Sequence, residues 1–298
     1  MGFQKATKTQ IKPKIVLMGP SGSGKTYTAL RLATGIIKKT HGRIAFIDSE
    51  NKRGKYYAKE FDYDYMEIVA PYNPEKYIGA VDNAIDDGYS VVIVDSATHE
   101  WSGPGGILNI KANMPGTNDF TKWESLTPRH SAFTSKMLLS DVVVIVCVRG
   151  KDEYVLEIND KGKQVPKKVG MGADFRAGLE YDATVAFLLD QESHVAQVTK
   201  DNTHIFDGTN GVKLYEVLTE KHGETIMNWA NSGEVAELPE ISKPMNENQK
   251  EQLLKLMESV GIDKMKTEMY NLTNKNNSGD LTEEEADKLI KKLNKVGV

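Results

Sequence analysis

The sequence predicts an α/β fold with a mostly parallel central sheet, followed by a small C-terminal helical domain. Three observations predict this class. Short aliphatic runs followed by polar residues, typical of strands buried on both faces, recur at 15–18, 44–47, 91–94 and 142–148. A glycine-rich octapeptide separates the first run from a stretch with helical spacing. Near the end of the chain, a stretch rich in glutamate and proline precedes three short helical patterns.

Length and composition exclude several classes of protein. The 298 residues suffice for one large α/β domain with an appendage. The only cysteine, Cys147, excludes a disulfide framework and a zinc site built on cysteine pairs. No apolar run approaches the roughly twenty residues of a membrane span, and no signal-peptide core is recognisable, so we expect a cytoplasmic protein without a membrane partner. The net charge of −4 does not favour nucleic-acid binding unless a basic surface forms locally.

The octapeptide GPSGSGKT is a full match to the phosphate-binding loop pattern. Glycines reach left-handed backbone angles and let successive amides converge on phosphate oxygens. The lysine is expected to neutralise β and γ phosphates, and the threonine hydroxyl to ligate Mg²⁺. The following helix would point its free amides at the phosphates. The alternative is a glycine-rich turn without a ligand. The predicted binding residues are Gly19, Pro20, Ser21, Gly22, Ser23, Gly24, Lys25 and Thr26.

The second predicted strand, 43–47, is followed by Asp48, Ser49 and Glu50. A carboxylate at the end of a strand beside a phosphate loop is well placed to orient an attacking water molecule. The alternative is that Asp48 or Glu50 only caps the next helix.

The third predicted strand follows an amphipathic helix at 75–88. Its four aliphatic residues at 91–94 run into Asp95, which is the Walker B pattern. In this pattern the carboxylate holds the magnesium shell. Many parallel strands end in aspartate, so the pattern alone is weak evidence for a magnesium site. The phosphate loop upstream makes that evidence strong.

A long polar region, 98–136, precedes the fourth predicted strand at 142–148. That strand ends at Arg149. A polar residue at this position could sense the γ phosphate, or Arg149 could pair with a surface carboxylate, and the sequence does not decide between them.

Residues 150–178 predict a β-hairpin with a basic tip and return arm. From Arg149 to Arg176 there are seven lysines and arginines against five acids, which reverses the sign of the whole chain. Single-stranded nucleic acid would suit this surface, bound through phosphates and stacked on Tyr154 or Phe175. A solvated hairpin is the alternative. Residues 1–13 predict a flexible or edge segment, with a DNA-touching arm as the alternative.

Two further strands are predicted at 183–189 and 194–199, the latter ending at Lys200, before a helix, or a strand plus a helix, at 212–229. We therefore expect a first domain over 1–231, a linker over 232–248 and a helical domain over 249–298. The three tail helices include a capping box formed by Thr282 and Glu285.

One stretch of the tail has the spacing of an EF-hand calcium loop. It lacks the aspartates that supply charge at the first, third and fifth positions. An ordinary helix connection is therefore favoured over calcium binding. The residues at this spacing are Asn274, Asn276, Ser278, Gly279 and Glu285.

The order GPSGSGKT, FIDSE (46–50) and VVIVDS (91–96) resembles the ATPase core of the RecA superfamily over roughly residues 12–230. Within that superfamily, later residues are similar to phage RecA-like AAA proteins, which include phage single-strand annealing ATPases. The residues that carry this second likeness are Arg149, Gly150, Lys151, Lys168, Val169, Gly170, Gly178, Leu179, Glu180 and Tyr181.

The resemblance implies ATP and Mg²⁺ as cofactors and assigns further roles. Glu50 matches the glutamate that activates water, Tyr57 the aromatic residue that stacks on adenine, and Lys200 the lysine that reaches a neighbouring subunit's ATP. The loops at roughly 102–130 and 151–178 match those that line the DNA path. Two features depart from RecA: the strand ending at Arg149 lacks the glutamine that couples ATP to DNA, and no long N-terminal helix and strand links subunits. The resemblance leaves a homo-oligomer open but does not imply a stable filament.

The function implied is ATP hydrolysis coupled to single-stranded DNA in phage recombination or replication, in the cytoplasm of a bacterial host. Annealing or strand pairing with a single-strand DNA-binding protein is expected. The alternative is a nucleotide-dependent adaptor or loader that recruits a helicase or another replication component without DNA-stimulated hydrolysis. A small-molecule kinase is disfavoured, because the glutamate after the second strand and the late strands fit the RecA pattern better.

Overall fold

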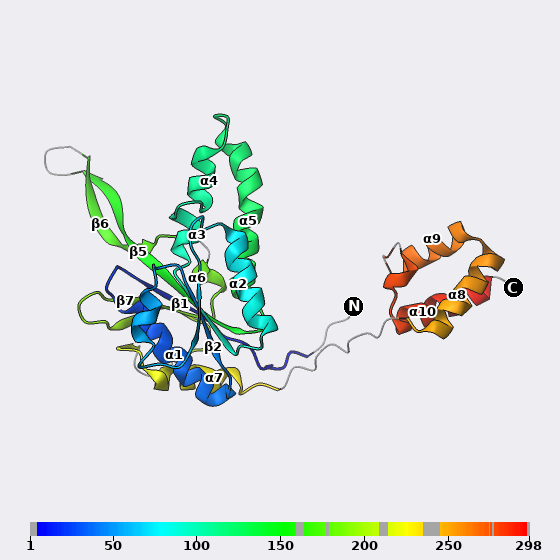
Figure 1. Cartoon of the computed structure of the whole chain (residues 1–298), viewed down its shortest axis with the longest axis horizontal. Helices are drawn as coiled ribbons and strands as arrows, with labels where there is room; N and C mark the ends of the chain where they lie inside the picture. The colour runs from blue at the N-terminus through cyan, green and yellow to red at the C-terminus, as the bar shows by residue number, and fades with distance from the viewer. Residues whose placement is uncertain are drawn as a thin grey trace. The chain divides into compact units, whose positions relative to one another are not determined.

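The computed structural model describes residues 5–158, 164–176, 179–208, 214–234, 245–273, 275 and 277–296. The chain forms two compact units, residues 1–234 and 235–298. The first unit has a central sheet with helices on both faces, and the described part of the second contains three α-helices (Figure 1). Most of the expected linker, 235–244, lies outside the described residues. No helix in the described ranges is long and apolar enough to cross a membrane.

The sheet of the first unit has the strand order β3-β2-β4-β5-β1-β7-β8-β9, with β6 paired to β5 off this path. All pairs from β3 to β7 along this order are parallel, whereas β6, β8 and β9 pair antiparallel. The predicted α/β class with a mostly parallel sheet is confirmed. The strands are β1 (Lys14–Gly19), β2 (Ile44–Asp48), β3 (Asp64–Glu67), β4 (Val91–Asp95), β5 (Val143–Ile158), β6 (Gln164–Ala173), β7 (Val185–Leu189), β8 (Ala196–Asp201) and β9 (Tyr215–Glu216).

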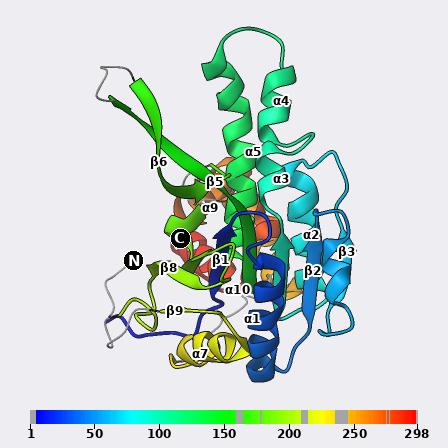
Figure 2. The same cartoon turned by 90° about the vertical axis from the view of Figure 1, so that its left-hand side faces the viewer.

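Helices cover both faces of the sheet, as Figure 2 shows. On one face α1 (Lys25–Thr40) and α7 (Glu220–Ala230) pack in the same hydrophobic cluster as Leu17. On the other face α2 (Pro74–Asp86) and α5 (Asp119–Leu139) pack in the cluster that contains Val16. Because neighbouring strand residues face opposite buried layers, the central strands β1, β2, β4 and β7 are buried and almost entirely apolar along their length. The shorter helices of this unit are η1 (Arg53–Tyr57), α3 (Thr98–Ser102), α4 (Ile107–Asn113) and α6 (Leu179–Asp182).

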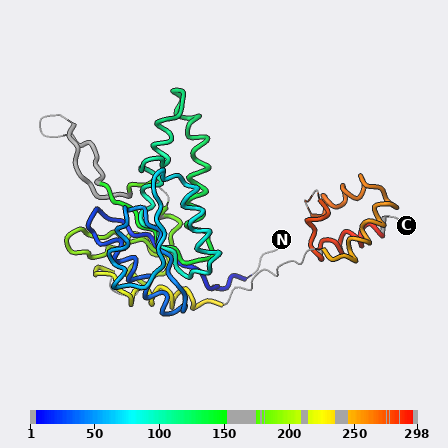
Figure 3. Tube along the Cα trace, viewed as in Figure 1, coloured from blue at the N-terminus to red at the C-terminus, as the bar shows by residue number. Residues whose placement is uncertain are grey.

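The polar region after β4 folds into α3, α4 and α5, which the sequence analysis did not predict as helices. Helices α4 and α5 run side by side in the Cα trace (Figure 3). Helix α5 continues through Pro128 and is tied to α2 by two ion pairs, Arg129 with Glu75 at 2.7 Å and Lys136 with Asp82 at 2.6 Å.

Strand β5 changes partners along its length. Up to Arg149 it pairs with β1, and from Gly150 onwards it pairs antiparallel with β6. The predicted hairpin is therefore confirmed, although the side chains of 152–173, including Tyr154, lie outside the described residues. Phe175 is only 6% exposed and packs in the core, with its ring centroid 5.1 Å from that of His130. The prediction that Phe175 offers a stacking surface for bases is wrong.

The N-terminal segment is held as an edge segment. Thr9 forms an isolated parallel bridge with Glu234, and the Lys8 ammonium donates to the Trp229 carbonyl at 3.0 Å and lies 4.3 Å from the Trp229 ring centroid. These contacts tie the segment to the end of α7, so the alternative of a free DNA-touching arm is not supported for residues 5–11.

The second unit packs α8 (Glu247–Val260), α9 (Ile262–Thr273), η2 (Ser278–Asp280) and α10 (Glu283–Val296). The capping box is confirmed, because Thr282 N donates to Glu285 and Glu285 N donates to Thr282 Oγ1. The Lys275 ammonium lies 2.6 Å from the Glu285 carboxylate, so a cation of the chain already pairs with the glutamate of the EF-hand spacing. This contact supports an ordinary helix connection, although Asn274 and Asn276 lie outside the described residues.

Candidate functional site

The predicted site residues come from strands whose carboxyl ends meet at one edge of the sheet. In the register, Gly19 of β1 lies beside Arg149 of β5, and Asp48 of β2 lies beside Asp95 of β4. Strand β5 separates β1 from β4. Arg149 therefore lies between the glycine-rich loop, which follows β1, and Asp95, which ends β4.

The loop has the backbone that its glycines predict. Gly22 and Gly24 have φ values of 83° and 84°, in the left-handed region that favours glycine. Lys25 begins α1, and its ammonium donates to the carbonyls of Gly19 and Pro20, each at 2.8 Å. Burial lowers the pKa of Lys25. The Ser23 hydroxyl is buried without a hydrogen-bond partner among the described residues. The Lys25 ammonium, whose hydrogen-bond partners are neutral carbonyls, lines the cavity and fits a site for phosphate oxygens.

Thr26 and Asp95 form the predicted metal-binding pair. The Thr26 hydroxyl donates to the Asp95 carboxylate at 2.5 Å, and Asp95 is only 3% exposed. Burial raises the pKa of Asp95 to about 6. One hydroxyl and one carboxylate suit Mg²⁺ that is otherwise held by phosphates and water. The described part of the chain contains no cluster of three or more His, Cys, Asp or Glu that could hold a metal alone.

Glu50 is held by Arg149. The Arg149 guanidinium donates to both Glu50 carboxylate oxygens, at 2.9 and 2.6 Å, and the side chains of Glu50 and Arg149 are 10% and 43% exposed. Burial alone would raise the pKa of Glu50, but the hydrogen bonds and charge of Arg149 outweigh burial and lower it. Arg149 therefore pairs with a carboxylate of the cavity rather than with one on the surface.

Asp48 and Glu50 have different surroundings. The Asp48 carboxylate accepts hydrogen bonds from Glu50 N at 2.5 Å, Gly54 N at 2.9 Å and the Tyr65 hydroxyl at 3.1 Å. Asp48 is fully buried and shapes the loop after β2, whereas Glu50 lines the cavity. The alternative role, capping of the next helix, therefore applies to Asp48, which accepts from Gly54 N of η1, and not to Glu50.

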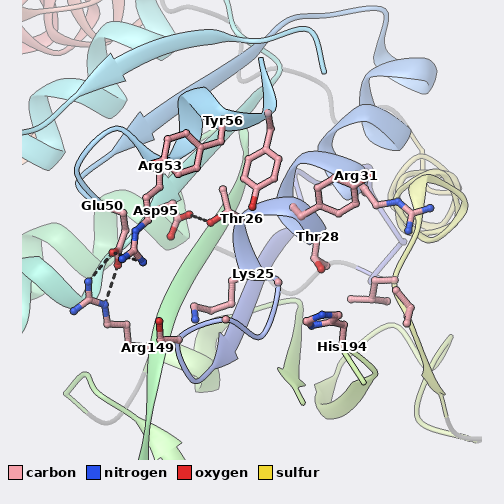
Figure 4. A pocket seen from close by; sticks show the side chains of 17 residues that line it. Lys25, Thr26, Thr28, Arg31, Glu50, Arg53, Tyr56, Asp95, Arg149 and His194 are labelled. Carbon is pink, nitrogen blue, oxygen red and sulfur yellow. Dashed lines mark hydrogen bonds and ion pairs between the residues drawn. The ribbon is translucent and has the colours of Figure 1, made fainter. Parts of the chain in front are cut away.

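A cavity of about 560 Å³ is lined by Lys25, Thr26, Glu50, Asp95 and Arg149 (Figure 4). Tyr57 lines it, with its ring in edge contact with Tyr27 at 5.5 Å between centroids. The other described lining residues are Ser21, Gly22, Gly24, Thr28, Arg31, Arg53, Tyr56, His194, Val217 and Leu218.

The structure does not bring Lys200 to this cavity. Lys200 pairs with Ala186 in the sheet, and β8 runs antiparallel to β7. Lys200 therefore lies at the sheet edge opposite to the glycine-rich loop, where its ammonium donates to the Tyr181 carbonyl. A role of Lys200 within its own subunit's site is excluded by this position, and its role toward a neighbouring subunit's ATP stays a prediction.

Three of the cavity residues that the sequence did not predict carry basic side chains: Arg31, Arg53 and His194. Arg31 lies two turns into α1 and binds the Glu220 carboxylate at 3.0 and 2.9 Å. Arg53 follows the predicted Glu50 by three residues and lies 3.8 Å from its carboxylate. His194 stands in the turn between β7 and β8, and no local signal in the sequence marks it.

The glycine-rich loop between β1 and α1, the lysine that begins α1 and the buried Thr26–Asp95 pair at the same sheet edge define a P-loop nucleotide-binding domain. A family model described as an AAA domain matches residues 11–226. Because this match covers more than half of the 298 residues, the chain belongs to the AAA domain family, which supports nucleotide binding and hydrolysis. A comparison with curated proteins found no match.

Proposed function

We propose that the protein is a RecA-like, Mg²⁺-dependent ATPase that acts on single-stranded DNA in phage recombination or replication. The observation that carries the proposal is the course of β5. This strand lies between the two nucleotide-binding strands, places Arg149 on Glu50, and continues into the hairpin with β6. One continuous strand thus links the cavity to the segment whose sequence is basic.

The residues of the cavity have separate roles in this proposal. Lys25 and the loop amides hold the phosphates of ATP, and Thr26 and Asp95 hold Mg²⁺. Bound Mg²⁺ supplies positive charge beside the β and γ phosphates. Glu50 orients the water molecule, and Tyr57 stacks on adenine. In a homo-oligomer, Lys200 contributes to a neighbouring subunit's site.

The Arg149 guanidinium takes one lone pair on each Glu50 oxygen and lowers the pKa of Glu50, so Glu50 is a weaker base toward water while the pair is closed. The base of the hairpin contacts the same arginine. Asp174 N donates to the Arg149 carbonyl at 2.7 Å, and the Asp174 carboxylate lies 3.8 Å from the Lys151 ammonium. Arg149 N donates to Thr98 Oγ1 at 2.8 Å. We propose that DNA on the hairpin shifts Arg149 and thereby frees Glu50.

The ion pairs of α4 and α5 favour the hairpin as the DNA contact. Of the three lysines and arginines in 102–130, Lys111 binds Asp119 at 2.9 Å and Arg129 binds Glu75 at 2.7 Å. Of these three side chains, Lys122 alone has no ion-pair partner among the described residues. The region 102–130 therefore offers little free positive charge for phosphates, and the proposed DNA contact lies mainly on 151–178.

Annealing or strand pairing together with a single-strand DNA-binding protein, in the cytoplasm of a bacterial host, is the process that the resemblance to phage RecA-like proteins supports. The second unit exposes several large apolar side chains, which would suit a contact with an additional partner protein. This observation supports the second candidate, an adaptor or loader that recruits a replication component. The exposed residues are Leu254, Ile262, Tyr270 and Leu272, with exposed fractions of 57, 48, 49 and 41%.

The proposal is tested by fluorescence anisotropy of a labelled thymidine oligonucleotide, with and without Mg·ATP, at two salt concentrations. We expect ATP-dependent binding that weakens with salt, because the hairpin lysines would contact phosphates. Lys25→Ala should lose the ATP dependence, and Lys39→Ala, an exposed lysine on the same helix, should retain it. If the unaltered protein binds ATP but its affinity for the oligonucleotide changes neither with ATP nor with salt, the result would favour the adaptor instead.

A further inference from the structure

The turn between β7 and β8 is built by its own hydrogen bonds. The Asp190 carboxylate accepts from the amides of Glu192 at 3.1 Å and Ser193 at 2.9 Å, and from the Ser193 hydroxyl at 2.7 Å. Asp190 N donates to the Val195 carbonyl at 3.0 Å. These bonds hold His194 at a φ of 57°, a left-handed conformation that non-glycine residues rarely adopt. Such conformations occur often at ligand sites, where the surroundings enforce them.

This turn packs against the phosphate loop. The Gln191 side-chain amide donates to the Ser21 carbonyl at 3.0 Å. The His194 Nδ1 atom lies 3.5 Å from the position that a Cβ atom would take on Gly24. The Leu189 carbonyl, where the turn begins, lies 2.8 Å from the equivalent position on Gly19. The turn therefore forms a wall of the loop.

The His194 imidazole faces the cavity with its polar atoms free. The residue is exposed and lines the cavity, and its ring has no hydrogen-bond or ion-pair partner among the described residues. The three arginines of the cavity differ in this respect, because Arg31 binds Glu220 and both Arg149 and Arg53 pair with Glu50. An imidazole always has at least one N–H to donate. His194 can therefore serve a ligand without first leaving another partner.

The position of His194 indicates which part of a nucleotide it would meet. In Figure 4, Lys25 lies between Arg149 and His194. Arg149, Glu50 and the Thr26–Asp95 pair mark the end of the cavity for the γ phosphate and metal. His194 lies on the other side, toward Thr28 and Arg31. A nucleotide with its γ phosphate at the Arg149 end would bring its α phosphate toward the His194 side of Lys25.

We propose that His194 is a nucleotide-binding residue that donates a ring N–H to an α-phosphate oxygen. The inference rests on the proposed nucleotide site and adds a contact from the β7–β8 turn. Since ATP and ADP share the α phosphate, the contact affects both nucleotides equally. Because His194 lies away from Glu50, it affects binding rather than the chemical step.

The test compares His194→Gly with His41→Gly. Both histidines are exposed and left-handed, so glycine fits both backbones, but His41 does not line the cavity. Affinities for ATP, for ADP and for the two diastereomers of ATP carrying sulfur on the α phosphate are measured by calorimetry. His194→Gly should weaken ATP and ADP equally, by about tenfold, as expected for a hydrogen bond to a charged group. His41→Gly should bind as the unaltered protein does.

The sulfur-substituted nucleotides separate a contact from a structural effect. The unaltered protein should bind one diastereomer less tightly than ATP, because sulfur is the weaker acceptor, and His194→Gly should lose this difference. An equal difference in both proteins, or ATP affinity unchanged by His194→Gly, overturns the inference. If the glycine variant does not fold, His194→Ala, which removes the ring N–H and keeps a Cβ atom, gives the same comparison. Failure of the unaltered protein to bind ATP at all would refute the proposed function itself.

Discussion

The Arg149 guanidinium and the Glu50 carboxylate form a two-pronged ion pair, with N–O distances of 2.9 and 2.6 Å, across 99 positions of sequence. The pair joins β5 to the loop after β2, and it holds the residue proposed to orient water. Arg149 stands where β5 turns from its sheet partner β1 to its hairpin partner β6. The ion pair therefore lies between the cavity and the base of the hairpin.

Replacing Arg149 with alanine should raise ATP hydrolysis in the absence of DNA, because Glu50 no longer has to leave an ion pair. An increase of about fivefold is expected if opening the half-exposed pair costs ~1 kcal/mol. Stimulation by single-stranded DNA should shrink by a similar factor. Steady-state phosphate release measures both rates.

The matched control is Arg129→Ala, which breaks another two-pronged pair, with Glu75 at 2.7 and 2.8 Å, outside the cavity. It should leave the DNA-free rate unchanged. A rate below that of the unaltered protein in Arg149→Ala, with Arg129→Ala unaffected, would show that Arg149 takes part in the reaction and does not restrain it.

The buried Asp95 should make the nucleotide-free protein less stable as the pH rises. Its pKa increases from 3.8 to about 6 on folding, mainly through burial. A raised folded-state pKa gives stability that is fully present below about pH 4 and is lost as the pH rises through about 6. Asp95→Asn cannot ionise, so its stability relative to the unaltered protein should increase over this window.

Thermal unfolding of both proteins between pH 4 and 8, without nucleotide, measures this difference. Other carboxylates are present in both proteins, so their contributions largely cancel in the comparison. Parallel curves of unfolding temperature against pH would contradict a raised pKa of Asp95. Asp95→Asn should also lose Mg²⁺-dependent nucleotide affinity at every pH.

Two helical glycines should respond to alanine in opposite directions. A Cβ atom on Gly35 of α1 would lie 1.9 Å from the Glu220 carbonyl of α7, so the helices would have to separate. Gly35→Ala should lower the free energy of unfolding by about 2 kcal/mol, as overpacking does. A Cβ atom on Gly79 of α2 meets no atom within 4 Å, and Gly79→Ala should raise it by ~1 kcal/mol. Chemical denaturation measures both changes, and destabilisation by Gly79→Ala or tolerance of Gly35→Ala would refute this packing.

The sequence predicted those parts of the fold whose signal is local. Strands buried on both faces are aliphatic throughout, and the phosphate loop needs its glycines and lysine at fixed positions, so both could be found without tertiary information. Helix α5 was missed because its buried residues are few and one is a histidine. Leu126, His130, Phe133 and Met137 repeat at helical spacing, but Pro128 and polar neighbours mask the pattern.

The missed parts of the site depend on neighbours that are distant in sequence. Arg149 meets Glu50 only because β5 inserts between β1 and β4, and the strand order is not readable from the strands themselves. His194 reaches the loop because β7 pairs with β1, which brings the following turn beside Gly24. Lys200 lies far from the loop for a similar reason: β8 runs antiparallel to β7, so its end lies at the opposite edge of the sheet.

The central claim is that ATP bound at the glycine-rich loop is hydrolysed with water oriented by Glu50. The most direct test is Glu50→Gln, which keeps the size of the side chain and removes its charge. ATP affinity and single-turnover hydrolysis are measured on the same preparation, with the unaltered protein beside it. We predict that the variant retains Mg·ATP binding and loses turnover by at least about a hundredfold, as for removal of a positioned base. Turnover at the unaltered rate would contradict the account.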